Sequence, residues 1–347
     1  MSDAPGADTV SSSGPPFRPA WWAPTGLAQT LAGMRASSPM PPLRLETVLT
    51  PDGDELRLHW QDAHDARAPL VLLLHGLEGS RHSPYVRATA AAAAAHGFAF
   101  VALEFRSCGG VLNRARRTYH SGETTDCAFV VSTLAARAPG RPLLPIGFSL
   151  GGNVVLKWLG EVGDQAPANV LAAAAISPPY DLGACGHRCD TRLGGVLARH
   201  FLRTLIPTAI AKERQHPGIY DPVAVRRCRT FRAFDELVTA PVFGFRDVEH
   251  FYSSQGCGQF LHAIRRPALL VSALDDPLVD PAVLPHATIA ASKFLHAQFS
   301  PRGGHVAFLD GGAPWRPRRW AEAHAMQFFR AQLAAAGVPL PAFVPVR

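Results

Sequence analysis

A serine lies between two glycines near the middle of the chain, in the sequence Gly-Phe-Ser-Leu-Gly at 147–151. An apolar run from Leu143 ends at Ser149, and a segment of helical character, Leu150–Val162, follows it. The pattern therefore indicates a strand, a sharp turn and a helix. Such a turn lifts the serine hydroxyl out of the sheet edge and leaves room only for small residues two positions away. A serine presented in this way can act as a nucleophile once a base removes its proton.

Two further groups can complete a nucleophilic site. On a sheet of this type the acid and the histidine follow the serine in that chain order. The apolar run Ala268–Leu274 ends in two carboxylates, Asp275 and Asp276, and a later strand leads into Gly-Gly-His, which ends at His305. We expect Ser149 as nucleophile, His305 as its base, and Asp276 as the acid that orients the histidine. Asp275 stays open as the alternative acid.

Acyl transfer through a serine also needs two backbone N–H donors for the oxyanion. Leu150, directly after the serine, is expected to supply one of them. The glycine loop at 75–79 follows the apolar strand Leu70–Leu74, and we expect the N–H of Leu77 to be the second donor. His75 in the same loop is interpreted as a structural residue rather than a base.

The order of the apolar segments predicts the architecture that positions these groups. A β-hairpin is expected from Leu43 to Trp60, and after it strands and helices alternate, which is typical of a mostly parallel sheet with helices on both faces. We expect strands at 70–74, 98–103, 143–148, 170–176, 268–274 and 293–299, and helices at 84–95, 122–138, 150–162 and 318–335.

Residues 177–264 interrupt this alternation. Leu193–Ala211 and Val223–Val238 have helical character and strand signals are few, so a helical insertion is predicted over the carboxyl edge of the sheet. Apolar faces on these helices favour an acyl chain as the substrate. The domain is expected to span 17–336.

The two ends of the chain differ in character. Residues 1–16 are polar and are expected to be disordered, whereas Phe17–Met34 is apolar enough to lie as a strap on the body of the protein. The proline-rich tail, 337–347, is expected on the surface. We find neither a secretory signal nor a span long enough to cross a membrane.

Composition restricts the class of partner. The chain has 347 residues, 47% of them hydrophobic, and a formal net charge of +7, so it can bury a large core. Its arginines are scattered rather than collected in a basic block, which argues against nucleic-acid binding. Trp21 and Trp22, if exposed, would suit peripheral contact with a membrane.

The six cysteines form no Cys-x-x-Cys pair, so we expect reduced thiols and a cytoplasmic protein. Cys185 and Cys189, with His187 between them, lack a fourth ligand at a recognisable spacing and are interpreted as two thiols in a loop rather than a zinc site. We expect no metal and no organic cofactor.

Several motifs together match a known family. They are His-Gly-Leu-Glu-Gly-Ser at 75–80, Phe-Arg-Ser-Cys-Gly-Gly at 105–110, Asn113-Arg114, Tyr-His-Ser-Gly-Glu-Thr at 119–124, 147–153, Phe234-Asp235, Thr239-Ala240-Pro241, Gly244-Phe245, 275–277 and 303–305. Over about residues 17–335 the chain resembles the YheT-like α/β-hydrolases, which include plant embryogenesis-associated proteins and animal α/β-hydrolase-domain phospholipases. One departure is Leu27, where the family often has histidine.

The resemblance implies an α/β-hydrolase fold with a helical lid and a serine hydrolase of carboxylic esters with short to medium acyl chains. The triad positions carry over to Ser149, Asp276 and His305. Two alternatives stay open: a phospholipase or lipid acyltransferase at a membrane surface, and a non-catalytic scaffold with the same fold. The oligomeric state is not indicated.

Two segments near the site have more than one interpretation. Ser121 or Thr124 can cap the helix that follows, or the segment 119–126 forms a wall of the substrate site. The nearby arginines either attract a phosphate or carboxylate or lie in a solvated loop; they are Arg106, Arg114, Arg116 and Arg117.

Overall fold

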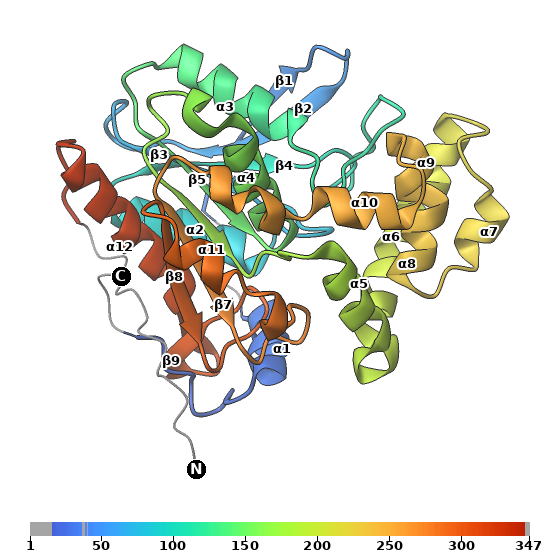
Figure 1. Ribbon diagram of the computed structural model, residues 1–347. Helices are drawn as coiled ribbons and strands as arrows, with labels where there is room; N and C mark the ends of the chain where they lie inside the picture. Colours follow the sequence, from blue (N-terminus) through green and yellow to red (C-terminus); the bar gives the residue numbers. More distant parts are fainter. Residues whose placement is uncertain (1–15, 37–38, 40, 344–347) are drawn as a thin grey trace.

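The computed structural model describes residues 16–36, 39 and 41–343. Its main sheet has eight strands in the order β1-β2-β4-β3-β5-β6-β7-β8 (Figure 1). Their bounds are β1 Arg44–Leu49, β2 Glu55–Gln61, β3 Leu70–Leu74, β4 Ala99–Glu104, β5 Leu143–Phe148, β6 Ala173–Ile176, β7 Ala268–Ala273 and β8 Leu295–Ser300. The hairpin β1–β2 and the pair β2–β4 are antiparallel, and the remaining pairs are parallel. The mostly parallel sheet is therefore confirmed.

Helices cover both faces of the sheet because its central strands are apolar on both sides. In β3, Leu72 and Leu74 belong to the core under α3 and α4, and Val71 and Leu73 to the core under α2 and α12. The bounds of these helices are α2 Pro84–Ala95, α3 Thr125–Arg137, α4 Leu150–Val162 and α12 Trp320–Ala335. The alternation expected from the sequence thus folds as a three-layer domain.

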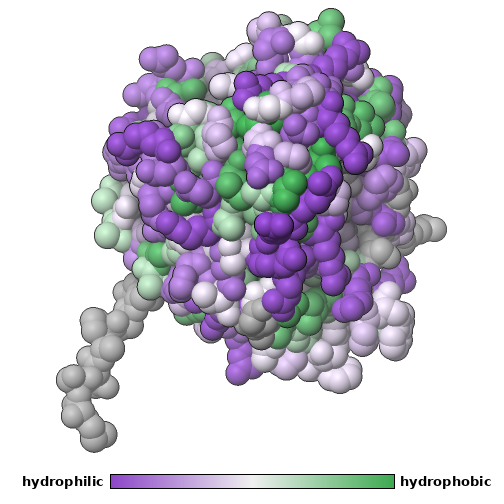
Figure 2. Space-filling model, turned by 90° about the vertical axis from the view of Figure 1, so that its right-hand side faces the viewer, coloured by the Kyte–Doolittle hydropathy of each residue, from purple (hydrophilic) through white to green (hydrophobic). Residues whose placement is uncertain are grey.

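The predicted helical insertion lies between β6 and β7, on one side of the sheet (Figure 1). It contains α5 Leu182–Thr191, η2 Arg192–Gly195, α6 Val196–Gln215, α7 Pro222–Arg226, α8 Phe231–Phe234, the π-helix η3 Asp235–Thr239, α9 Ala240–Phe243, α10 Val248–Gln255 and η4 Cys257–Ala263. Figure 2 views the molecule from this side and shows hydrophobic residues near the middle of the face, bordered by hydrophilic ones.

Two helical stretches expected in the insertion are confirmed as helical and differ in detail from the apolar pattern. The stretch Val223–Val238 is divided into α7, α8 and η3, because the side chain of Thr230 accepts the N–H of Ala233 and starts a new helix there. The helix expected from 193 begins only at Val196, after Gly195 has turned to a φ of 71°. Capping threonines and glycines with a positive φ set where helices begin, and the spacing of apolar residues does not show these positions.

The N-terminal segment confirms the expected strap. Phe17 is buried, with its ring 5.3 Å from that of Phe308 and 5.4 Å from that of Trp320. The segment continues into α1, Gly26–Arg35. The hairpin of β9 Leu309–Ala313 and β10 Arg316–Arg319 was not predicted, because its polar, glycine- and proline-containing strands lack apolar alternation.

The remaining short elements are η1 Gly163–Gln165, η5 Pro281–Val283 and α11 His286–Ala290. In the tail, Phe343 packs its ring edgewise on His96 at 5.0 Å, so this part lies on the surface as expected. The predicted disorder of 1–16 falls outside the described residues, except for Pro16, and so does the last part of the tail, 344–347.

Candidate active site

Ser149 stands on a sharp turn between β5 and α4, with a φ of 51° and a ψ of −119°. A β-carbon at Gly147 would lie 2.1 Å from the carbonyl oxygen of Gly151, and one at Gly151 would lie 2.2 Å from that of Leu74. Side chains at either glycine would therefore clash with backbone. The two glycines allow the strained backbone that presents the serine hydroxyl above the sheet.

The structure brings Ser149, His305 and Asp276 together although they come from distant parts of the chain. Nε2 of His305 lies 2.7 Å from Oγ of Ser149, and Nδ1 lies 3.0 Å from Oδ2 of Asp276. Asp276 is completely buried, and its Oδ1 accepts the backbone N–H groups of Leu278 and Val279 at 2.7 and 3.1 Å. The carboxylate is thus fixed on both oxygens with one of them facing the imidazole.

Asp275 does not contact the histidine ring. Its Oδ2 accepts the N–H of Gly26 and its Oδ1 accepts the N–H of Gly303, both at 2.8 Å. The carboxylate therefore joins the start of α1 to the loop before His305. Of the two adjacent aspartates, only Asp276 is in contact with the imidazole.

The electrostatics suit a histidine base. Burial alone would lower the pKa of His305, but the carboxylate of Asp276 outweighs it and raises the pKa above the ordinary value of 6.5. An adjacent carboxylate stabilises the imidazolium that forms when the histidine takes a proton. The same contact keeps the proton of the neutral ring on Nδ1, so that Nε2 is free to accept the serine proton.

Thr30 is a residue of the site that the sequence did not single out. Its Oγ1 accepts the backbone N–H of His305 at 2.8 Å and donates to the carbonyl oxygen of Gly26 at 2.7 Å. Because 275 residues separate the threonine from the histidine, no local pattern could reveal this contact. The strap therefore positions the histidine loop directly.

The glycine loop after β3 faces the serine. His75 is buried, donates from Nδ1 to the carbonyl oxygen of Gly76 at 2.7 Å, and accepts the N–H of Phe105 on Nε2 at 3.1 Å. Burial lowers its pKa to about 4, so the neutral ring joins two loops, and its structural interpretation is confirmed. Leu77 and Leu150 both border the cavity that contains Ser149, and the role of their N–H groups as oxyanion donors stays a prediction.

A largely apolar cavity extends from Ser149 into the helical insertion. Besides Ser149 and the two leucines, its walls include Tyr119, His120, Cys185, Phe201, Phe234 and Tyr252. Cys185 and Cys189 lie on helix α5, not in a loop as expected, and all six cysteines are free. The described residues contain no cluster of three or more side chains that could hold a metal ion.

Two carboxyl residues, Glu78 and Asp235, border this cavity, and Asp235 belongs to the π-helix η3. Asp235 accepts the hydroxyl of Thr239 at 2.6 Å and that of Tyr252 at 2.9 Å. Burial raises its pKa to about 6. These hydrogen bonds hold the π-helix against α10, and they place a polar group among apolar neighbours.

The first part of the segment 119–126 borders the site, and Ser121 and Thr124 do not cap the following helix as expected. Neither Ser121 nor Thr124 makes a capping hydrogen bond to α3; instead the carboxylate of Glu123 accepts the N–H groups of Thr125 and Asp126 at 2.9 and 3.3 Å. Ser121 borders the cavity together with Tyr119 and His120. The second interpretation, a wall of the substrate site, therefore matches the structure.

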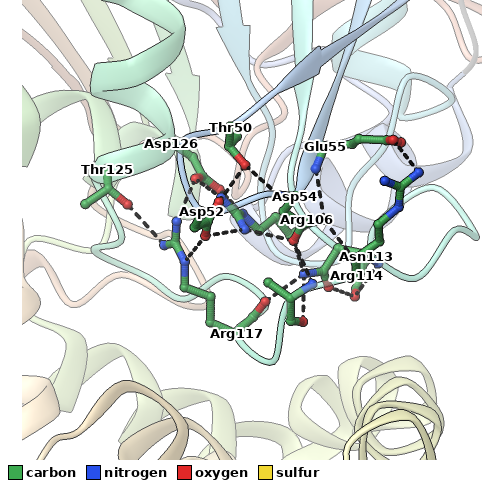
Figure 3. A network of polar contacts seen from close by, with 12 residues as sticks. Thr50, Asp52, Asp54, Glu55, Arg106, Asn113, Arg114, Arg117, Thr125 and Asp126 are labelled. Atoms are coloured by element: carbon green, nitrogen blue, oxygen red, sulfur yellow. Dashed lines mark hydrogen bonds and ion pairs between the residues drawn. The ribbon is translucent and has the colours of Figure 1, made fainter.

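The interpretation of Arg106 as part of a solvated or ligand-binding loop was wrong. Its guanidinium is fully buried in a network of polar contacts (Figure 3). It contacts Asp126 at 2.7 Å through two nitrogens, and also Asp52 at 2.9 Å and Asp54 at 2.8 Å. Three separate segments, the β1–β2 turn, the loop after β4 and the start of α3, are joined by this one side chain.

The other three arginines differ from one another. Arg117 joins the same network through Asp52, Glu123 and Asp126, and the exposed Arg114 pairs with Glu55. Arg116 is exposed and borders the cavity.

The network also connects the insertion to the body. The side-chain amide of Asn113 donates to Asp54 at 2.6 Å. Nζ of the buried Lys212, on α6, donates to the carbonyl oxygens of Asn113, at 3.1 Å, and of Ala115. The loop that borders the cavity is therefore held from below by the hairpin and from above by the insertion.

Comparisons with known proteins show the family to which the chain belongs. The family described as serine aminopeptidase, S33, matches residues 65–310. The putative esterase YheT of Escherichia coli is 33% identical over 289 residues, which cover 82% of this chain and 84% of that protein. The chain belongs to the YheT-like α/β-hydrolase family.

Other similarities agree with this membership. Mouse phospholipase ABHD3 is 28% identical to this YheT-like chain over 305 residues, with 85% of the chain and 74% of that protein covered. Among solved structures, the Pyrococcus furiosus esterase Pf2001 has a TM-score of 0.51 and 17% identity over 78% of this chain and 89% of that one. This last likeness is one of fold.

Proposed function

We propose that this protein is a serine hydrolase that cleaves carboxylic esters through an acyl-enzyme on Ser149. The observation that carries the proposal is the continuous contact from Oγ of Ser149 through the ring of His305 to Asp276, at 2.7 and 3.0 Å. Nucleophile, base and orienting acid in this order are the arrangement that serine hydrolases use. The names of its relatives, an esterase and a phospholipase, support the same reaction class.

Each residue has a defined part in this reaction. Nε2 of His305 takes the proton of Ser149 as the oxygen attacks the ester carbonyl, and the backbone N–H groups of Leu77 and Leu150 hold the oxyanion. His305 then protonates the leaving alcohol, and Asp276 stabilises the imidazolium throughout. Water, activated by the same histidine, releases the acid from the serine. No metal or organic cofactor takes part in the proposed steps.

The cavity favours an ester with a short to medium acyl chain. Its walls are mainly apolar and aromatic and come from both the sheet edge and the helical insertion, and such walls stabilise a hydrocarbon chain by removing it from water. We propose that residues 17–336 form one catalytic domain in which the insertion, 177–264, acts as the lid over this chain.

Replacement of the nucleophile tests the proposal. With p-nitrophenyl esters of two to sixteen carbons, Ser149→Ala should lose at least about 10³-fold in kcat/KM, whereas Ser253→Ala, in an exposed position on α10, should keep full activity. Full activity of Ser149→Ala would overturn the proposal. Labelling by a fluorophosphonate that depends on Ser149 would exclude the alternative of a non-catalytic scaffold.

A phospholipase or lipid acyltransferase is the second candidate, and the position of Arg116 favours it. This exposed guanidinium borders the cavity, where it can pair with the phosphate of a lipid head group. Adding phospholipid esters and acceptor alcohols to the same panel separates the candidates. Faster release of fatty acid from phospholipid than from the simple esters would favour this one.

The expected location in the cytoplasm stays a prediction. Within the described ranges, no helix combines the length and the apolar character needed to cross a bilayer. A peripheral contact with a membrane is compatible with the second candidate.

A further inference from the structure

Two indole rings on the surface of the described residues stand largely in solvent. Trp21 is 82% exposed and Trp315 is 86% exposed, the two highest values among the exposed large hydrophobic side chains of the described residues. Trp22 does not share this exposure, because it is half-buried and its Nε1–H donates to the carbonyl oxygen of Gly312 at 3.0 Å. The condition of exposure set above for Trp21 and Trp22 is therefore met by Trp21 and not by Trp22.

Trp21 and Trp315 belong to segments that lie side by side. The N–H of Ala20 donates to the carbonyl oxygen of Leu309 at 2.8 Å, and the contact of Trp22 with Gly312 continues this pairing along β9. Trp315 lies in the turn between β9 and β10, whose ends pair Ala313 with Arg316. The two exposed rings therefore extend from one continuous surface, which we call the indole surface: residues 18–22, 302 and 310–318.

The indole surface carries an excess of positive charge. Arg18, Arg302, Arg316 and Arg318 are exposed, and of these Arg318 pairs with Asp310. Arg302 donates to a backbone carbonyl, that of Pro24. Within the part of the chain that the structure describes, the other three arginines have no ion pair with a carboxylate.

We propose that the indole surface docks on an anionic lipid bilayer. An indole combines a large apolar area with a polar N–H and therefore partitions to the boundary between head groups and acyl chains. Arginines around such rings add attraction to anionic lipids. Two exposed indoles with uncompensated arginines match this boundary better than nucleic acid, whose recognition requires longer basic tracts.

The indole surface is connected in the fold to the loop that carries His305. The strap that carries Trp21 continues into α1, where Thr30 holds the N–H of His305, and β9 begins four residues after that histidine. In Figure 1, α1 and β9 lie at the same end of the molecule. Docking would therefore bring the histidine loop near the lipid surface whether the substrate is a lipid or an ester dissolved in it.

Vesicle binding by the full chain tests this proposal without involving hydrolysis. In the Ser149→Ala background, the protein is sedimented with vesicles of phosphatidylglycerol and phosphatidylcholine or of phosphatidylcholine alone. We expect binding to the anionic vesicles that weakens with salt. The double variant Trp21→Ala/Trp315→Ala should bind about tenfold more weakly, because two large apolar side chains no longer enter the interface.

The controls separate this proposal from the others. Phe343→Ala removes an aromatic side chain that is 57% exposed but lies outside the indole surface, and it should leave vesicle binding unchanged. The double variant Trp21→Ala/Trp315→Ala, made in the protein that keeps Ser149, should still hydrolyse dissolved short-chain esters. Loss of vesicle binding can therefore be told apart from failure of the proposed hydrolase reaction.

Two results would overturn the docking proposal. One is equal binding of parent and double variant to anionic vesicles, or no binding by either. The other is a dimer of the parent, measured by light scattering without lipid, that the tryptophan variant converts to monomers, because the surface would then be an interface between copies of this chain.

Discussion

Thr30 and His305 are joined by a hydrogen bond in which the threonine hydroxyl accepts the backbone N–H of the histidine at 2.8 Å. The contact makes the N-terminal strap part of the support of the proposed base. Misplacing a catalytic group by a fraction of an ångström lowers the rate without removing any reacting atom.

Thr30→Val, which keeps the shape and removes the hydroxyl, should therefore lower kcat on a p-nitrophenyl ester by about tenfold or more. KM should change little, because the side chain does not border the cavity. Thr30→Ser, which keeps the hydroxyl, should recover most of the rate. Equal loss in both variants would indicate that packing, not the hydrogen bond, is responsible.

The acid side of the pH profile should report on His305. The base must be neutral to accept the serine proton, and the Asp276 carboxylate raises its pKa above 6.5 although burial opposes this. We therefore expect kcat/KM to rise with pH through an apparent pKa above that value. A rate that is flat between pH 5 and pH 8 would contradict the assignment.

Asp276→Asn should lower kcat by about 10⁴-fold, because the amide stabilises the wrong tautomer of the histidine. Asp275→Asn is the matched comparison. Its side chain holds two backbone N–H groups but does not contact the imidazole, so its loss of rate should be far smaller. If the two variants lost activity equally, Asp276 would not be the sole orienting acid.

Replacement of Arg106 should destabilise the fold. Arg106→Gln leaves the buried Asp54 without its cation and leaves the buried Asp126 with Arg117 alone, and breaking a buried ion pair costs about 3–5 kcal/mol in the free energy of unfolding. Arg114→Gln removes an exposed pair with Glu55 and should cost less than about 1 kcal/mol. Urea denaturation of both variants measures the difference.

The same network makes a prediction for acid. Although burial opposes it, hydrogen bonds from Asn113 and from backbone N–H groups lower the pKa of Asp54 below its usual value of 3.8. A carboxylate with a lowered pKa stabilises the fold above its unfolded pKa and loses that contribution as the pH falls toward the folded pKa. The free energy of unfolding should therefore decrease with acidification below about pH 4, and this dependence should be shallower in Asp54→Asn.

The tight turn around Ser149 gives a steric test. Gly151→Ala would place a methyl group 2.2 Å from the carbonyl oxygen of Leu74, so the turn must shift and activity should fall by at least about 10²-fold. Gly140→Ala meets no atom within 4 Å and should match the parent in rate and thermal stability. Undiminished hydrolysis by Gly151→Ala would contradict the proposed role of the turn.

The parts of the site that were predictable are those with local signatures. Ser149 needs glycines at fixed offsets, and Asp276 and His305 must each follow a strand. All three can therefore be recognised from a single amino-acid sequence. The parallel sheet was visible for a similar reason, because strands buried on both faces are continuously apolar.

What could not be predicted depends on contacts between distant segments. An arginine in a loop is usually exposed to solvent. Arg106 is buried because the hairpin and α3 supply three aspartates that pair with it. Thr30 reaches the histidine loop only after the strap has folded over the sheet edge. The helical stretch Val223–Val238 is interrupted at Thr230, whose side chain caps a new helix. A threonine can hydrogen-bond to the backbone either inside a helix or at its start, so the local sequence alone does not decide between the two.

The hydrogen bond that the N–H of Gly26 donates to Asp275 limits how far the chain can be shortened from its N-terminal side. An N-terminal deletion or a cleavage site placed beyond Phe17 would remove a packed piece of the folded domain and, further along, the support of the histidine. Affinity tags and fusion partners therefore belong upstream of residue 16, where they leave the strap seated.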